Sequence, residues 1–161
     1  MIARYSFGFA LSTILAFGLC GPVDAACDDL VDRLITNKLK PVIEDLDCSV
    51  VKNLGVDKKD HKLVGVCYES TGAMSKIRID TQLHCQGSDQ SVVSKIVGKH
   101  AIPSVSENVT VVAEARGSDC KVIDAQIKPS GELGKALASL FDANGKARDA
   151  LQQGLTEACG K

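Results

Sequence analysis

The sequence has no tryptophan and few other aromatic residues, with two tyrosines and four phenylalanines among 161 residues. Four of these six precede Gly18, so only Tyr68 and Phe141 remain in the rest of the chain. Surfaces that stack bases or sugar rings need aromatic side chains. The 19 basic and 20 acidic residues leave a net charge of −1, without the basic excess that attracts nucleic acid or an anionic membrane. We therefore expect no nucleic-acid partner and no stable membrane insertion.

Metal-binding and catalytic motifs with short spacings are missing as well. Beyond residue 25, no two cysteines are closer than 18 residues, so the chain lacks the CxxC knuckles of zinc sites. The three histidines, His61, His84 and His100, show neither HExxH nor HxH spacing, and no glycine-rich phosphate loop is present. The sequence therefore predicts no metal site and no cofactor.

The first 25 residues have the layout of a secretory signal peptide. Arg4 supplies a positive charge, residues 7–19 are apolar, and Ala25 is a small residue suited to the cleavage site. The apolar run of 13 residues is shorter than the roughly 20 that span a bilayer, which disfavours a membrane anchor. We expect cleavage after Ala25, leaving residues 26–161 as one soluble domain in the periplasm or outside the cell.

Hydrophobic periodicity predicts which parts of this domain are helices and which are strands. Apolar residues three and four apart predict an amphipathic helix at residues 28–46, with either a kink near Leu39 or a second short helix that begins at Pro41. Alternating apolar and polar residues predict strands in the middle of the chain. The predicted strands are residues 62–68, 76–85, 108–116 and 121–128, and the other predicted helices are residues 92–97, 133–141 and 150–158.

These elements predict an α+β fold. A sheet with one apolar face needs a cover, and the N-terminal and C-terminal helices have apolar stripes that match it. We expect a four-stranded, mainly antiparallel sheet with these helices packed on one face and disulfides stapling the domain.

Six cysteines follow the predicted cleavage site, and an even number in an exported chain indicates three disulfides. The pairings that we expect are Cys48–Cys85, Cys67–Cys120 and Cys27–Cys159. The first follows from an antiparallel meander, which places the end of the second strand beside the segment leaving the N-terminal helix. The third would clasp the two terminal helices together. A local bond between Cys27 and Cys48 is the main alternative.

Two short patterns resemble elements of serine acyltransferases. Ser49 and Lys52 fit SxxK, and Ser106 and Asn108 fit SxN. The third element, K-[ST]-G, is missing, and such short patterns often arise by chance. We therefore assign no catalytic residue.

By exclusion, the sequence predicts an exported, non-enzymatic binding or interaction protein whose partner is a small apolar ligand or a protein of the cell envelope. One hypothesis is that the apolar sheet face forms a ligand cavity under the terminal helices, and its alternative is that this face is simply the packed core. The residues of this face are Ile77, Ile79, Leu83, Val109 and Val111. The alternative function is a small extracytoplasmic serine-type hydrolase.

Overall fold

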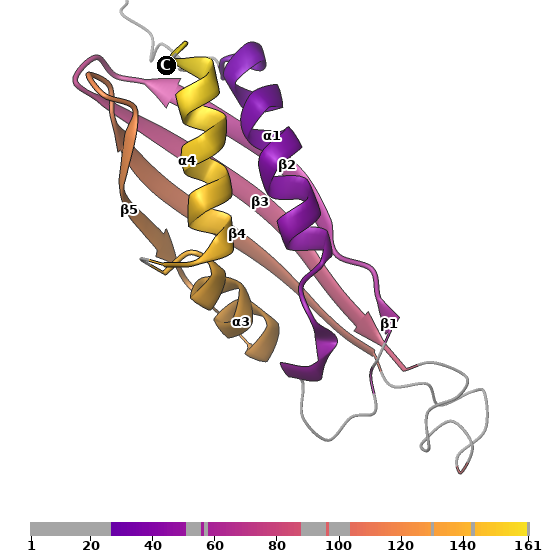
Figure 1. The fold of residues 1–161 in the computed structure, drawn as a ribbon. Helices are drawn as coiled ribbons and strands as arrows, with labels where there is room; N and C mark the ends of the chain where they lie inside the picture. Colours follow the sequence, from indigo (N-terminus) through magenta and orange to yellow (C-terminus); the bar gives the residue numbers. More distant parts are fainter. Residues whose placement is uncertain are drawn as a thin grey trace, which may run out of the picture.

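An antiparallel sheet carries the three α-helices of the described residues on one face in the computed structural model of the chain (Figure 1). The structure describes residues 27–50, 56, 58–87, 96, 104–129, 131–142 and 144–160. The helices are α1 (Asp29–Glu44), the short 3-10 helix η1 (Cys48–Val50), α3 (Glu132–Leu140) and α4 (Lys146–Ala158). The strands are β1 (Lys58–Lys59), β2 (Lys62–Ser70), β3 (Met74–Gln86), β4 (Ser104–Arg116) and β5 (Lys121–Ile127). The predicted signal peptide lies outside the described residues, as does the helix predicted at residues 92–97 apart from Ile96.

The sheet is the antiparallel meander that the alternation of residues predicts. Strands run in the order β1-β3-β4-β5, and β2 also pairs with β3. The two central strands, β3 and β4, have 13 residues each and pair from Met74↔Arg116 to Gln86↔Ser104. Because side chains alternate between the faces of a strand, Ile77 and Ile79 are buried on one face while Lys76 and Arg78 are exposed on the other. The predicted α+β fold is confirmed.

The terminal helices lie side by side and antiparallel over the apolar face of the sheet (Figure 1). Gly154 of α4 makes this close approach possible, since a Cβ at that position would stand 2.8 Å from the Cα of Ile35 in α1. Pro41 lies inside α1, which continues to Glu44. Among the described residues, none of the helices combines the length and apolar character needed to cross a membrane.

Both outer strands are tied to the helix above them by polar contacts. On β2, the backbone N–H of Tyr68 donates to Asp32 Oδ1 at 2.7 Å, and its carbonyl accepts from the Asp28 N–H at 3.1 Å. On β5, the N–H of Val122 donates to Gln152 Oε1 at 2.9 Å. An exposed strand edge invites pairing with other chains. These bonds occupy edge positions of β2 and β5 and anchor each helix to its own side of the sheet.

The structure contains three disulfides: Cys27–Cys67, Cys48–Cys85 and Cys120–Cys159. The predicted pair Cys48–Cys85 is present, whereas the predictions Cys67–Cys120 and Cys27–Cys159 are wrong. Cys67 lies in β2 and Cys120 precedes β5, and these strands are separated by β3 and β4. Three strand spacings amount to about 14 Å, twice the Cα separation that a disulfide allows.

The predicted disulfide between the terminal helices, Cys27–Cys159, is wrong for a related reason. Each terminal cysteine bonds to the side of the sheet that its own helix already contacts, Cys27 to β2 beside α1 and Cys159 to the turn before β5 beside α4. The helices are therefore neighbours without a bond between them. Three disulfides are typical of proteins that fold in oxidising compartments outside the cytoplasm.

Candidate functional site

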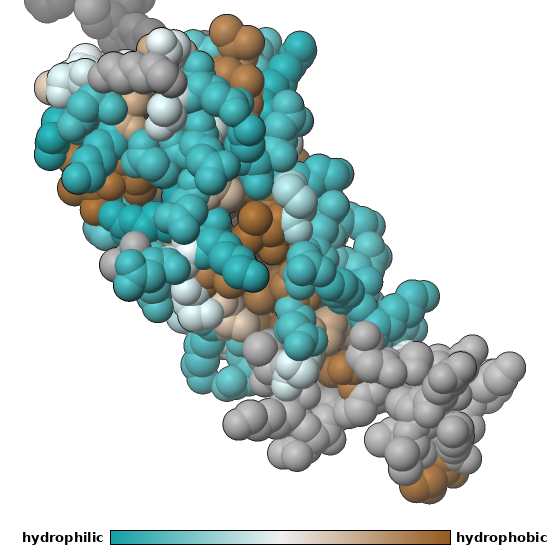
Figure 2. Space-filling model, in the orientation of Figure 1, coloured by the Kyte–Doolittle hydropathy of each residue, from teal (hydrophilic) through white to brown (hydrophobic). Residues whose placement is uncertain are grey.

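An open groove lies between the C-terminal end of α1, helix α3 and the start of α4. Its volume is about 430 Å³, within the range of small-molecule sites. Figure 2 shows apolar surface between α1 and α3, with hydrophilic surface around it. The lining residues are Pro41, Val42, Asp45, Leu46, Asp47, Ala136, Ser139, Leu140 and Lys146. The groove thus combines an apolar floor with a polar rim.

The floor of the groove consists of apolar side chains at the edges of the buried apolar faces of α1 and α3. In α1, Val42 lies beside the fully buried Ile43, and in α3, Ala136 and Leu140 lie beside the fully buried Leu137. All three floor residues are only half-buried. Because the sheet takes only the centre of each stripe, the flanks remain in contact with solvent and face one another across the groove.

Two carboxylates and one ammonium group form the charged part of the rim. The pKa of Asp45 lies below its usual value, mainly because Lys59 donates a hydrogen bond to it. The pKa of Asp47 is also lowered, because the backbone N–H and the hydroxyl of Ser49 both donate to its carboxylate. Both groups are therefore negatively charged at neutral pH. The third charge, the Lys146 ammonium, lies at the start of α4.

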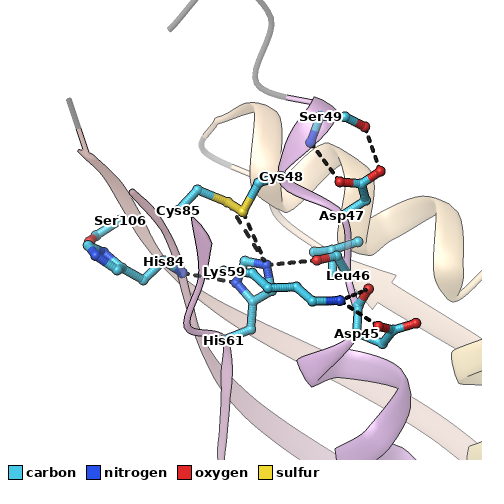
Figure 3. The surroundings of a disulfide bond; sticks show 10 residues. All are labelled: Asp45, Leu46, Asp47, Cys48, Ser49, Lys59, His61, His84, Cys85 and Ser106. Carbon is cyan, nitrogen blue, oxygen red and sulfur yellow. Dashed lines mark hydrogen bonds and ion pairs between the residues drawn. A yellow bond between two sulfur atoms is a disulfide. The ribbon is translucent and has the colours of Figure 1, made fainter. Parts of the chain in front are cut away.

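One side of the groove is supplied by Asp45, Leu46 and Asp47. Together with Cys48 they form the wall segment, residues 45–48, which is held at three points (Figure 3). The Lys59 ammonium donates to the carbonyl of Asp45 at 3.2 Å. The imidazole of His61 bonds to the carbonyl of Leu46 at 3.0 Å. Cys48 is joined to β3 by its disulfide with Cys85. The position of this side of the groove therefore depends on residues that do not touch the groove themselves.

His61 is buried, with 4% of its surface exposed, and its neighbours determine where its proton lies. The backbone N–H of His84 donates to Nδ1 at 3.0 Å, so Nδ1 carries no hydrogen. Nε2 must then carry the proton that it donates to the carbonyl of Leu46. Burial is the main cause that holds the pKa of His61 below its usual value. The ring is thus a neutral hydrogen-bond donor beside the disulfide.

This environment predicts a loss of stability in mild acid. Below about pH 6.5 the unfolded chain protonates His61, while the folded chain resists until the pH reaches its lower folded-state pKa. Stability is therefore complete above that window and falls within it, by at most about 1.4 kcal/mol per pH unit. Urea unfolding at about pH 7.5 and about pH 5.5 measures the loss. His61→Gln should reduce this slope and His84→Gln should retain it, whereas an unchanged slope in His61→Gln would contradict the assignment.

His61 and the neighbouring disulfide also form the cluster that comes nearest to a metal site among the described residues. One ligand atom from each of Cys48, His61 and Cys85 lies within 4.8 Å of the other two. Metal ions bind thiolates and unprotonated imidazole nitrogens. Here both sulfurs belong to a disulfide, 3.8 Å and 3.9 Å from Nε2, and this nitrogen carries the proton. In this state the cluster fastens the wall segment and offers no thiolate to a cation.

A serine and a histidine meet on the opposite, open face of the sheet. Ser106 and His84 are paired residues of β4 and β3, and Ser106 Oγ lies 2.5 Å from His84 Nδ1 (Figure 3). A histidine that activates a serine is usually oriented by a carboxylate on its second nitrogen. Among the described residues, no carboxylate is hydrogen-bonded to the His84 ring. The pair therefore has two of the three parts of a catalytic triad.

The other candidates from the sequence are only partly within the described residues. Ser49 donates its hydroxyl proton to Asp47 at 2.7 Å, and its SxxK partner Lys52 lies outside the described residues, as does His100. Asn108 is exposed on the same face of β4 as Ser106. The five residues of the apolar sheet face are at most 3% exposed and belong to the hydrophobic core, as the alternative to a ligand cavity predicts.

The apolar periodicity places Val42 and Leu140 in the stripes of their helices. This pattern alone does not say that the flank of a stripe stays uncovered. One feature of the sequence does indicate the groove, namely the width of these apolar stripes. Val42 beside Ile43 and Ala136 beside Leu137 make the stripes wider than the part that a sheet can cover.

Comparison with known protein families finds a match. The sequence profile of a protein family named Y4fE matches residues 22–159, which include all six paired cysteines. No curated protein and no solved structure matches the chain. The arrangement of side chains around the groove therefore carries the argument about function.

Proposed function

This chain belongs to the Y4fE family, and we propose that it is a non-enzymatic binding protein that holds a small apolar ligand in the groove between α1 and α3. The observation that carries the proposal is an open groove of about 430 Å³ with a floor of half-buried aliphatic side chains. Ligand sites are typically concave, mostly apolar and provided with a few polar groups. The groove has each of these properties.

The proposal includes export of the protein. The three disulfides are consistent with an oxidising compartment, and the N-terminal layout is that of a cleaved signal peptide. The mature protein then begins at Ala26 and acts in the periplasm or outside the cell. N-terminal sequencing of exported protein tests this, and a chain that retains Arg4 would contradict it.

Substitution of Leu140 by glutamate is expected to weaken binding of an apolar probe at least about tenfold, or about 1.4 kcal/mol. The substitution places a charge on the floor, where the bound probe would have to desolvate it. Titration of the protein with the fluorescent probe N-phenyl-1-naphthylamine measures the affinity. Leu30→Glu is the matched control, because Leu30 lies on α1 with 67% of its surface exposed and does not line the groove.

A second variant separates loss of binding from loss of folding. Ala136→Leu keeps the floor apolar but fills space in the groove, so it should weaken probe binding while the circular dichroism spectrum stays that of the native protein. If both groove variants bind the probe as tightly as Leu30→Glu, the groove is not the binding site.

The alternative function is a small serine-type hydrolase outside the cytoplasm, and the observation that favours it is the contact between Ser106 and His84. In that chemistry Ser106 Oγ attacks an ester carbonyl while its proton passes to His84 Nδ1. A fluorophosphonate probe distinguishes the two functions. Labelling of Ser106 that disappears in His84→Ala would favour the hydrolase, and absence of labelling would leave the binding function.

A further inference from the structure

The charged groups around the groove differ in whether they already have partners. Asp45 is paired with Lys59, which contacts both its side chain and its backbone carbonyl. Asp47 accepts two hydrogen bonds from Ser49 within its own turn. In contrast, the Lys146 ammonium forms no hydrogen bond or ion pair within the described part of the chain, although its charge also contributes to lowering the pKa of Asp45. It is exposed beside the apolar floor.

We propose that the ligand is an amphiphile with one anionic head group, such as an aliphatic monocarboxylate, and that Lys146 binds the head while the aliphatic body lies on the groove floor. This proposal rests on the proposed function and specifies its ligand class. Because Asp45 already pairs with Lys59, the Lys146 ammonium is available to a ligand carboxylate.

The position of Lys146 supports a role in recognition. Lys146 is the first residue of α4, where a cation meets the positive end of the helix dipole, so stability does not favour a lysine there. An anion beside Lys146 would be attracted by the ammonium and by the same helix end. The Lys146 side chain is therefore better placed to bind an anion than to stabilise α4.

The lining and the volume of the groove also limit the size of the ligand. The floor residues Val42, Ala136 and Leu140 come from α1 and α3, and Lys146 lies at the groove's border with α4. An extended aliphatic chain can therefore contact both helices while its head remains at the rim. The volume of about 430 Å³ suits a single small amphiphile.

Three probes of equal chain length test the head-group preference: decanoate, decanol and decylamine. We expect decanoate to displace N-phenyl-1-naphthylamine at about one fifth of the concentration that decanol requires, the effect of a partly exposed ion pair of about 1 kcal/mol. Decylamine should be the weakest of the three. The preference for decanoate should decrease at high ionic strength, because salt screens exposed charges.

Lys146→Gln should weaken decanoate binding about fivefold and so remove the difference between decanoate and decanol. Lys135→Gln is the matched control, since Lys135 is an exposed lysine of α3 that pairs with Glu132 and does not line the groove. Equal binding of the three probes, or retention of the preference in Lys146→Gln, would overturn this proposal and leave the binding function intact. Failure of the naphthylamine probe and of all three amphiphiles to bind would overturn the binding function itself.

Discussion

Replacement of Cys48 and Cys85 together by alanine is expected to lower the free energy of unfolding by about 4 kcal/mol. The bond joins residues 37 positions apart, and the loop-closure relation gives about this value for such a loop. Both cysteines are buried, with 2% and 0% of their surface exposed, so loss of the sulfur atoms also leaves a small void beside His61. Guanidinium denaturation of the two proteins measures the difference.

The control is the double substitution of Cys120 and Cys159 by alanine. That bond spans 39 positions, so its loop-closure contribution is almost the same, but Cys159 is exposed. The Cys48/Cys85 variant should therefore be the less stable of the two. It should also bind the naphthylamine probe more weakly, because the bond holds the wall segment, and the control should not. If the control variant loses as much stability and as much probe affinity as the Cys48/Cys85 variant, these losses are not specific to the bond that holds the wall segment. The prediction would then be wrong.

The elements of the fold were predictable because their signals are local. The alternation in residues 76–85 specifies a half-buried strand, and β3 extends over Met74–Gln86. The terminal helices end within a few residues of their predicted limits, apart from the start of α4 at Lys146. That start depends on Gly145, where a Cβ would collide with the carbonyl of Leu140 and where apolar periodicity gives no information.

The disulfide pairing was only partly predictable because it depends on which helix covers which strand. The antiparallel meander alone predicts Cys48–Cys85, because it places the end of β3 beside the segment that leaves α1. The other two pairs depend on α1 lying over β2 and α4 beside β5, and these placements rest on long-range contacts such as that between Asp32 and Tyr68. No spacing rule in the sequence records contacts of this kind.

The groove and the contacts that hold the wall segment could not be predicted from the sequence for a similar reason. The spacing of the histidines predicts no role for His61, whereas the structure buries it between the Leu46 carbonyl and the His84 N–H. The sequence also contains an acid, Glu107, in the middle of a strand whose other residues alternate. Only the fold shows that this acid faces the core side, where its carboxylate meets the start of α3.

Glu107→Gln is expected to lower the free energy of unfolding by about 3 kcal/mol. The carboxylate of Glu107, which is 9% exposed, accepts hydrogen bonds from the backbone N–H of Gly131 at 2.7 Å and of Gly134 at 2.9 Å. Charge-assisted bonds of this kind contribute about 1.5–3 kcal/mol each, and an anion at a helix N-terminus is stabilised further. The glutamine amide has the same size but only one acceptor oxygen, so one buried N–H would face an NH₂ group.

The acid and the start of α3 lie very close together. A Cβ at position 134 would stand near a carboxylate oxygen of Glu107 and 3.1 Å from the Cα of Pro129, so a glycine at this position allows the close approach. Urea denaturation of Glu107→Gln tests the prediction against Glu114→Gln, an exposed acid of the same strand that should change stability by less than about 0.5 kcal/mol. Because α3 forms the far side of the groove, Glu107→Gln should also weaken probe binding. Equal stability of the two variants would show that β4 does not hold α3 through this acid.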